Sequence, residues 1–420
     1  MAKDAAISGF HKLMPEERLK LITEILNLSS DDVDALYKHG ALSIEVADKL
    51  IENVIGNIEV PLGIATNFLI NGKDYFIPMA IEEASVVAAC SKAAKIARPS
   101  GGFTAYSTDP VMIGQIQVMD LPSPEESSIR ILSQKQKLIA LANEKSKTLR
   151  EKNSGAIDIE TRILRSRKKM LIVHLLVNVQ DAMGANIVNT MCEFIAPEIE
   201  RITGGRVNLR ILSNLSIYRR AYATAKFRKD LVGGEAAVNS IMEAYEFAEA
   251  DIFRAATHNK GVMNGIDAVL LATFNDWRAV EAGAHAFVSM GGYHSMTKYS
   301  VDNSGDIIGS IELPLAVGIV GGAASVSKKA MACRKILGVT SASELSSVIA
   351  AVGLAQNFSA IKALASEGIQ KGHMKLHSRN IAISAGATPD EVGKLSTMLV
   401  ESGDISPTNA KNLLEKLRKK

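Results

Sequence analysis

The chain has 420 residues, of which 47% are hydrophobic and 22% are charged, a composition typical of a globular protein with two or three domains. Its 48 basic and 45 acidic residues are spread along the chain and give a formal charge of only +3. This balance argues against nucleic acid as the main partner, because nucleic-acid-binding proteins concentrate positive charge on one surface.

Cys90, Cys192 and Cys333 are isolated in apolar surroundings, and no CxxC motif occurs. This pattern indicates buried thiols of a reducing compartment, and it excludes a disulfide framework or a cysteine zinc site. The N-terminus carries no apolar run, and the longest apolar stretches are too short or too interrupted by glycine to cross a membrane. We therefore expect no secretory signal, no membrane span and no metal site.

The first 50 residues predict short helices, with one start at Pro15 and a second at the capping pattern Ser29–Asp32. The next stretch is IENVIG at 51–56, a polar pair followed by β-branched residues and glycine. On its residues alone, we interpret this stretch as the entry to a strand.

A hairpin is predicted over residues 67–81 with its turn at Asn71-Gly72, and a helix is predicted over residues 85–97. Glu83 therefore falls at a strand-to-helix junction, which is a common place for functional residues. The alternative is that Glu83 only stabilises the start of the helix, as an acidic side chain does there.

From about residue 109 to residue 212 the predicted order is strand, helix, strand, strand, helix, strand. The strands are expected at 111–119, 156–164, 170–179 and 207–212, and the helices at 123–147 and 185–202. The basic run RSRKK is interpreted as a solvated hairpin turn between the second and third strands. This order is that of a ferredoxin-like βαββαβ unit, and no GxGxxG motif indicates a Rossmann domain.

The turn DAMGAN at 181–186 lies between the third strand and the second helix of this unit. Gly184 removes a side chain there, and the start of the following helix presents free N–H groups that suit a pyrophosphate. By itself the signal is weak, because many strand-to-helix turns contain glycine.

Residues 215–370 are expected to rejoin the first part of the chain. They predict a second hairpin over 300–314, a glycine-rich loop at 318–322 and a long apolar helix over 343–366. The loop either approaches a ligand or packs closely, and we favour the ligand loop. Gln356 is out of character in the apolar helix, where an internally satisfied polar pair with its neighbour is the alternative to a binding role.

The stretch from Arg254 to His285 places cations, acids, histidines and asparagines in a context rich in Ala, Gly and Val. Small residues allow close approach, so these polar groups are expected to meet in a tight space. Lys260 is a candidate electrophile there, and Asp276 could hold it charged and aimed. A buried structural ion pair is the alternative. The single Trp277 is interpreted as a core anchor.

The last fifty residues predict a separate helical unit, with a capping box at Thr388–Glu391 and a second helix start at Ser406-Pro407. Gly368 and Gly372 bracket a hinge before this unit. It is too small for a sizeable core, so we expect a flap that depends on docking.

These motifs resemble those of the 3-hydroxy-3-methylglutaryl-CoA reductase family in its soluble class II form. HNKGVMNGIDAV and NDWRAVEAGAH are similar to its lysine and aspartate segments. Four further stretches agree, namely IENVIG, EEASVVAA, DAMGAN and GHMKLH. The resemblance runs from about residue 10 to the C-terminus, and it implies a reductase of the isoprenoid or mevalonate pathway that interconverts hydroxymethylglutaryl-CoA and mevalonate, in either the synthetic or the degradative direction.

The resemblance implies an α+β fold. A large, mainly helical substrate domain with a central helix and small sheet elements (1–108 and 215–370) would be interrupted by a ferredoxin-like cofactor domain (109–214). A C-terminal flap (371–420) would follow. It also implies a cytoplasmic homodimer, without a membrane anchor, whose active site lies across the subunit interface near the 51–56 stretch.

The resemblance implies four catalytic residues. Lys260 would be the cation at the carbonyl oxygen, and Asp276 would tune and hold it. Glu83 would supply a proton to the mevaldehyde carbonyl, and His373 would protonate the CoA thiolate. His377 is the less favoured candidate for that last role.

The remaining site residues are also assigned through the resemblance. Arg254, Ser85 and Asn264 would hold the hydroxymethylglutaryl group. The nicotinamide cofactor would contact Asp181, Met183, Gly184, Asn186, Asn214, Ser146 and Gln356. NADH-using relatives place an aspartate where this chain has Ser146, flanked by Lys145, Lys147 and Arg150. We therefore expect NADPH to be preferred and NADH tolerated.

Two alternatives remain from the sequence. The chain could be another NAD(P)-dependent acyl-CoA reductase on the same scaffold. It could also be a non-catalytic protein that binds a CoA ligand.

Overall fold

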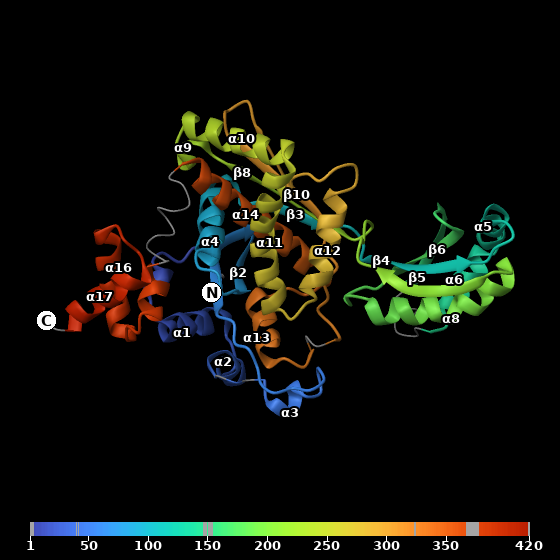
Figure 1. Cartoon of the computed structure of the whole chain (residues 1–420), viewed down its shortest axis with the longest axis horizontal. Coiled ribbons are helices and arrows are strands. Elements are labelled where there is room, and N and C mark those ends of the chain that lie inside the picture. Colours follow the sequence, from blue (N-terminus) through green and yellow to red (C-terminus); the bar gives the residue numbers. More distant parts are fainter. Residues whose placement is uncertain are drawn as a thin grey trace.

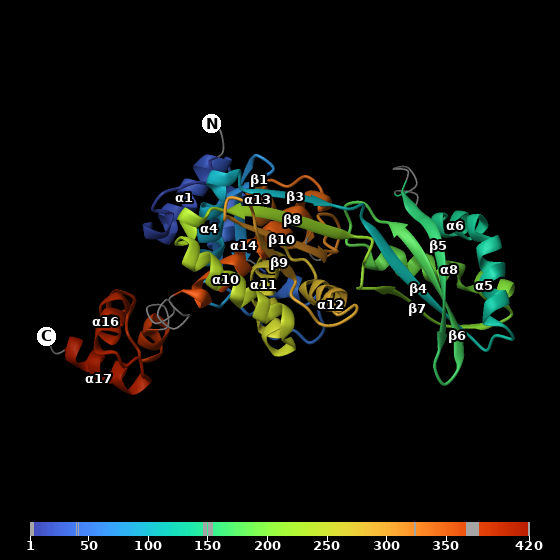
Figure 2. The same cartoon turned by 90° about the horizontal axis from the view of Figure 1, so that it is seen from above.

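The computed structural model describes residues 4–38, 40, 42–145, 149, 154–322, 325–366 and 378–418. Ser146, His373 and His377, which carry predictions, lie outside these residues. The described chain combines a large central part, a smaller sheet unit at one end and a helical C-terminal unit at the other (Figures 1 and 2).

The central part is built on a six-stranded sheet in the order β2-β1-β3-β8-β10-β9. Its strands are β1 (Leu62–Ile70), β2 (Lys73–Ala80), β3 (Phe103–Ser107), β8 (Arg220–Phe227), β9 (Thr297–Val301) and β10 (Ile307–Pro314). All neighbouring strands run antiparallel except β1 and β3, which are parallel. Both predicted hairpins form, and at the first turn Asn71 and Gly72 have the positive φ angles of 51° and 75° that such a turn requires.

One helix of the central part, α14 (Ala342–Ala365), is mostly buried. The others are α4 (Val86–Ala97), α9 (Lys229–Val232), α10 (Glu235–Ala250), α11 (Ile252–Ala272), α12 (Trp277–Val288) and α13 (Lys328–Leu337). Helices α11 and α14 approach closely at two glycines. A Cβ on Gly265 would lie 2.8 Å from the Gln356 side chain, and one on Gly353 would lie 2.9 Å from Ile266. These helices and the sheet enclose the main hydrophobic core.

Helix α14 is long and apolar enough to cross a membrane by length and composition, with a mean hydropathy of 1.5 over its most apolar window. However, 72% of that window is buried inside the folded chain. A helix that is apolar all round is expected wherever it is surrounded by protein, so α14 is the core helix of the central part.

The smaller unit has a four-stranded sheet in the order β5-β6-β4-β7, with all neighbours antiparallel. Its elements are β4 (Val111–Met119), α5 (Pro124–Ser133), α6 (Lys135–Asn143), β5 (Gly155–Arg165), β6 (Lys169–Asn178), α8 (Ala185–Thr203) and β7 (Arg206–Ser213). This order confirms the predicted ferredoxin-like arrangement. The helices pack on one face of the sheet and enclose a hydrophobic core of their own.

One detail of the smaller unit differs from prediction. The single helix expected over 123–147 is divided at Gln134 into α5 and α6. The Ser133 hydroxyl donates to the carbonyl of Arg130 at 2.8 Å. Such a local hydrogen bond competes with the helical backbone bonds and can bend or end a helix. The spacing of apolar residues in the sequence does not indicate this bond.

The N-terminal residues form a small cluster of helices beside β2 and α13. They comprise η1 (Phe10–Lys12), α1 (Pro15–Leu26), α2 (Ser30–Tyr37) and α3 (Ile44–Ala47), with a small core of their own. The interpretation of residues 51–56 as a strand entry is wrong, since β1 begins only at Leu62. Ile55 and Ile58 are fully exposed, at 102% and 95%. No strand of the described chain pairs with this stretch, and an unpaired strand has no stabilising hydrogen bonds.

The C-terminal unit consists of a helical stretch at 378–384, α16 (Pro389–Ser402) and α17 (Pro407–Arg418). The predicted capping box forms, because Thr388 N donates to the Glu391 carboxylate at 2.8 Å. The unit has its own small core, and it lies at the opposite end of the molecule from the four-stranded sheet in both views (Figures 1 and 2).

Candidate active site

A charged cluster forms where the loop after β2 meets α11. The Lys260 ammonium donates to Glu83 Oε2 at 2.8 Å, and the Asn264 amide donates to the same oxygen at 3.2 Å. Lys260 and Asn264 are four residues apart, so they share one face of α11. The Lys260 side chain is 61% exposed, which differs from the tight enclosure expected from the sequence and leaves it accessible to a substrate.

Ser85 begins α4 in an unusual backbone conformation, with φ 80° and ψ −19°. Non-glycine residues rarely adopt a positive φ, and such strain concentrates at functional sites. The Ser85 hydroxyl caps no backbone N–H of α4, and Ser85 lines the cavity beside that helix. Ser85 is therefore placed to meet a ligand two residues from Glu83.

Arg254 lies in the first turn of α11 and is partly buried. In the described part of the chain, no carboxylate or carbonyl accepts a hydrogen bond from its guanidinium group. Burial lowers the pKa of Arg254, although an arginine stays charged at neutral pH. A partly desolvated guanidinium without a protein acceptor is suited to bind a carboxylate from a ligand.

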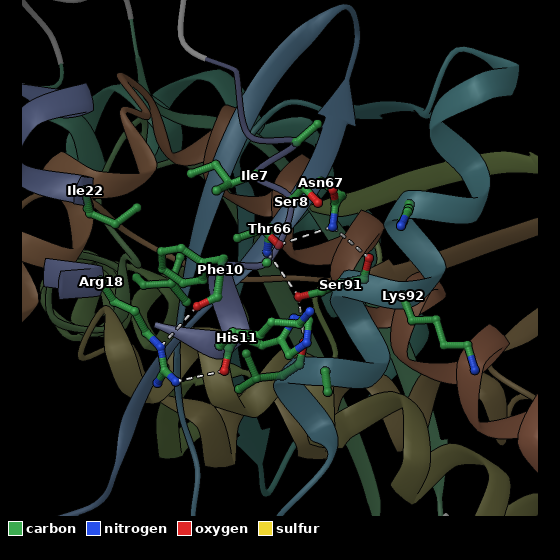
Figure 3. A pocket seen from close by; sticks show the side chains of 18 of the residues that line it. Ile7, Ser8, Phe10, His11, Arg18, Ile22, Thr66, Asn67, Ser91 and Lys92 are labelled. Atoms are coloured by element: carbon green, nitrogen blue, oxygen red, sulfur yellow. Dashed lines mark hydrogen bonds between the residues drawn. The ribbon is translucent and has the colours of Figure 1, made fainter. Parts of the chain in front are cut away.

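A cavity of about 1130 Å³ lies between the N-terminal segment, β1 and α4 (Figure 3). Phe10 and Ile22 contribute to an apolar wall on one side. On the other side, Ser91 of α4 is tied to β1, because its hydroxyl accepts from Thr66 N at 3.1 Å and its carbonyl accepts from the Asn67 amide at 3.3 Å. The volume of the cavity and its mixed apolar and polar lining suit a ligand with an apolar chain and a polar end.

Lysine side chains gather around this cavity. Lys12, Lys92 and Lys95 belong to its lining, and none of them makes an ion pair within the described residues. Arg98 also lines it, but that side chain is engaged by Asp74 at 2.6 Å. Unpaired lysines at the rim of an apolar cavity favour a ligand that carries phosphate groups. Sequence analysis missed them, although Lys92 and Lys95 interrupt the apolar helix at a spacing that places both on one side of α4.

The expected contact between Lys260 and Asp276 does not form within the described chain. Asn275 N donates to Leu270 O at 2.8 Å, so the corner at Asp276 is level with Leu270. Leu270 is ten residues beyond Lys260, which is about 15 Å along the axis of α11. Helical side chains also point toward the N-terminus, so Lys260 points away from Asp276. The Asp276 carboxylate instead accepts from Ala279 N at 3.1 Å and caps α12.

Asp267 and Glu281 form an acidic pair between α11 and α12 that sequence analysis did not identify. Burial and the neighbouring Glu281 raise the pKa of Asp267 well above its usual value. Two close carboxylates repel each other, so this arrangement favours the protonated form of the buried Asp267. Nothing in the spacing of the two residues indicates this pairing.

The turn at 181–186 is shaped to approach a dinucleotide. Gly184 has φ 104°, and a Cβ there would lie 2.7 Å from Val179. No side chain caps the start of α8, so the N–H groups of its first turn, including that of the exposed Asn186, remain available to a phosphate. Among the described residues, no group of three or more His, Cys, Asp or Glu could hold a metal ion.

Three other residues assigned to the cofactor, Asp181, Asn214 and Gln356, do not form one cluster with the first turn of α8. The Asp181 carboxylate accepts from Ala342 N at 2.8 Å, at the start of α14. Asn214 lies just after β7, at the return to the central part. Gln356 is buried in α14, where its side chain accepts from the Cys90 thiol at 3.0 Å. Its assignment to the cofactor stays a prediction that no contact supports.

Known proteins resemble this chain over nearly its full length. It is 57% identical over 418 residues to 3-hydroxy-3-methylglutaryl-coenzyme A reductase of Archaeoglobus fulgidus, covering 99% of this chain and 96% of that one. A structure of the Streptococcus pneumoniae enzyme matches with a TM-score of 0.84 at 38% identity, covering 98% and 99% of the two chains. Another structure, of that class II enzyme bound to NADPH in open conformations, matches with a TM-score of 0.82, also at 38% identity, covering 97% of this chain and 100% of that one.

The fold and the site, together with these matches, define the class of the chain as an NAD(P)H-dependent oxidoreductase. The family model of hydroxymethylglutaryl-coenzyme A reductase matches residues 14–378. The chain belongs to this family.

Proposed function

We propose that the chain interconverts hydroxymethylglutaryl-CoA and mevalonate plus CoA, with NAD(P)H as the reductant. The observation that carries this proposal is the Lys260–Glu83–Asn264 cluster. Glu83 lies two residues before Ser85, and Ser85 lines the cavity. Reduction of a thioester to an alcohol requires two hydrides, supplied by the bound cofactor in succession. It also requires one proton for the alcohol oxygen and one for the departing thiolate.

Lys260 is the proposed cation at the carbonyl oxygen of the substrate. Its ammonium group is fixed by Glu83 at 2.8 Å and is exposed on its outer side, so it can donate a hydrogen bond to the oxygen that gains negative charge. Glu83 is the proposed source of the alcohol proton, which the Lys260–Glu83 hydrogen bond can relay. Asn264 keeps the Glu83 carboxylate in place.

The substrate is proposed to bind along α4 and α11. Arg254 would donate hydrogen bonds to the carboxylate of the hydroxymethylglutaryl group, because its guanidinium is partly buried and has no acceptor within the described chain. Ser85 would contact the same group. The pantetheine chain would then enter the apolar cavity, and the phosphates of CoA would meet Lys92, Lys95 and Lys12 at its rim.

Replacing both Lys92 and Lys95 by glutamine should raise the KM for hydroxymethylglutaryl-CoA about fivefold to tenfold, which corresponds to about 1 kcal/mol for exposed charge-assisted contacts. The KM for hydroxymethylglutaryl-pantetheine, which lacks the nucleotide, should stay the same. Steady-state kinetics with the two thioesters measures the difference. Lys298→Gln, an exposed lysine on β9, is the matched control. An equal rise for both thioesters would exclude phosphate binding as the role of these lysines.

The site is proposed to be completed by a second subunit. The cofactor turn is tied to Ala342 at the start of α14, whereas the carbonyl of His258 accepts from the Asn357 amide fifteen residues further along that helix. Lys260, two residues from His258, is therefore roughly 20 Å from the cofactor turn of its own chain. Two chains arranged about a twofold axis would bring the turn and Asp276 of one subunit to Lys260 of the partner subunit.

The two separate sheets and the separate hydrophobic cores support the proposed domain boundaries. Residues 1–108 and 215–370 would form the substrate domain, residues 109–214 the cofactor domain and residues 371–420 a flap. The three buried cysteines are free, which suits a reducing compartment, and the likeness to the class II structures indicates a soluble protein. We therefore infer a cytoplasmic homodimer.

His373 is proposed, from the family resemblance alone, to protonate the CoA thiolate. His373→Gln should lower kcat for hydroxymethylglutaryl-CoA about 100-fold, a typical effect of losing a general acid. Reduction of added mevaldehyde should change less than threefold, because that step expels no thiolate. Parallel assays with the two substrates measure this, and equal losses on both would mean that His373 has another role.

A spectrophotometric assay tests the proposed function directly. Protein, hydroxymethylglutaryl-CoA and reduced cofactor are mixed, and the loss of nicotinamide absorbance is followed with NADPH and with NADH. Turnover with neither cofactor would favour a non-catalytic binding protein, and turnover only with another acyl-CoA would favour a different reductase. We expect NADPH to give the higher kcat/KM, and Ser146→Asp to shift the ratio toward NADH.

A further inference from the structure

Three segments that are distant in sequence meet beside the proposed cofactor turn. They are the turn itself (181–186), the loop after β10 (315–320) and the corner before α12 (273–276). Gly318 N donates to the Asn275 side chain at 2.8 Å, and Ile319 N donates to Asp181 O at 2.9 Å. A Cβ on Gly318 would lie 2.6 Å from Met183 N, so the loop and the turn are in direct backbone contact.

Arg219 lies under this junction and is only 4% exposed. One end of its guanidinium donates to the carbonyls of Ala182 at 3.1 Å and Met183 at 3.0 Å. The other end donates to the carbonyl of Val317. A single buried side chain therefore binds both the cofactor turn and the loop that contacts Asn275.

The Arg219 charge is not paired with a carboxylate within 4.0 Å in the described part of the chain. Burial lowers the pKa of Arg219 to about 10, so the group remains charged at neutral pH. A buried, unpaired charge is costly for folding unless hydrogen bonds satisfy it. Here three carbonyl groups do so, and the planar fork of arginine matches their arrangement, which a lysine ammonium cannot reproduce.

We propose that Arg219 is a positioning residue that locks the cofactor turn to the Asn275–Asp276 corner. The nicotinamide end of the cofactor and the Asp276 carboxylate then reach Lys260 of the partner subunit in a fixed spatial relation. This inference rests on the proposed function of the 181–186 turn and on the proposed dimer. It assigns to Arg219 a role in the rate of hydride transfer, beyond support of the junction between the two parts of the chain.

The experiment compares Arg219→Lys and Arg219→Met with Arg220→Met. Arg220 is the adjacent arginine, and its side chain pairs with Glu312 at 2.7 Å instead of bonding to the turn, so it is the matched control. We expect kcat to fall about 30- to 100-fold in Arg219→Met and about tenfold in Arg219→Lys, in line with the effect of small displacements of reacting groups. The primary isotope effect with 4-deuterated NADPH should rise in both, because misplacement makes hydride transfer slower than the other steps.

Two further measurements separate positioning from structural support. Binding of hydroxymethylglutaryl-CoA without cofactor should change less than threefold, and the thermal melt should stay cooperative. If Arg219→Met fails to fold, Arg219→Lys carries the test. The proposal is overturned if kcat and the isotope effect of the folded Arg219 variants match those of Arg220→Met. It is also overturned if kcat falls only in proportion to the loss of folded protein.

The proposed cofactor turn is tested separately with Asn186→Asp. An acid in the first turn of α8 favours the helix but repels a pyrophosphate at its N–H groups. The Kd for NADPH, measured by nicotinamide fluorescence, should rise about tenfold, as for one added like charge. An unchanged Kd would show that the turn does not bind the cofactor, whereas a raised Kd with unaffected Arg219 variants would overturn only the inference about Arg219.

Discussion

Lys260→Met should lower kcat for hydroxymethylglutaryl-CoA about 100- to 1000-fold, the loss that follows removal of one donor to a developing oxyanion. The Kd for the substrate should change less than threefold, because Arg254 and the cavity provide most of the binding surface. Methionine keeps the length of the side chain, and Lys260 is 61% exposed, so the fold should be preserved. Single-turnover kinetics and equilibrium binding measure the two quantities separately.

Lys298→Met is the matched control, since Lys298 is an exposed lysine on β9, and the Glu83 carboxylate bonds to Lys260 and Asn264 instead. Glu83→Gln tests the other half of the pair and should also reduce kcat strongly, because a neutral amide carries no charge opposite to the ammonium group and has no carboxyl proton to give. A Lys260→Met enzyme with kcat within threefold of the native value would eliminate Lys260 as the electrophile.

His258 should make the folded protein sensitive to mild acid. Its ring is 2% exposed, and burial together with nearby Arg254 lowers its pKa to about 4. The unfolded chain therefore binds a proton below about pH 6.5, whereas the folded chain resists protonation until about pH 4. Stability is complete above pH 6.5 and is lost as the pH falls through this window. Between pH 7.5 and pH 5 the free energy of unfolding should fall by about 2 kcal/mol from this group.

Urea unfolding, followed by the fluorescence of the single Trp277, measures this loss, because Trp277 packs against the main core. His258→Gln should remove most of the slope between pH 7 and pH 5. His174→Gln is the control on the other core; burial also lowers the pKa of His174, but less strongly. Nε2 of the buried His258 ring shares hydrogen bonds with the hydroxyls of Thr297 at 2.8 Å and Ser295 at 2.9 Å, which fix the ring in place. An unchanged slope in His258→Gln would show that other groups cause the acid sensitivity.

Local signals in the sequence were enough for most elements of the fold. The Asn71-Gly72 turn, the capping box at Thr388 and the strand alternation around residue 159 each depend on neighbours within a few positions. The ferredoxin-like order followed from the sequence of elements and is confirmed by the β5-β6-β4-β7 sheet. Lys260 was a candidate from the polar stretch around it and Glu83 from its strand-to-helix junction, and the structure places the two side chains 2.8 Å apart.

The contacts between these elements were not available from the sequence. Asp276 was expected beside Lys260 because both belong to one polar stretch, but the rigid rise of α11 keeps them apart. The break at Gln134 is accompanied by a side-chain hydrogen bond from Ser133 to Arg130 that the apolar spacing does not indicate. Arg219 gave no signal at all, since one of two adjacent arginines at the start of a strand reveals neither its burial nor its three carbonyl partners. Such features arise only when distant segments pack together.

The separation of Lys260 and Asp276 along α11 has a genetic consequence. If the proposed dimer forms, a chain with Lys260→Met and a chain with Asp276→Asn would each be inactive alone, yet a mixed dimer would contain one site with both side chains intact. Random pairing of equal amounts would make half of the dimers mixed, and with one of two sites restored in each, about a quarter of native activity should return. Two inactivating alleles would therefore complement each other in the proposed dimer, whereas two alleles that both change Lys260 would not.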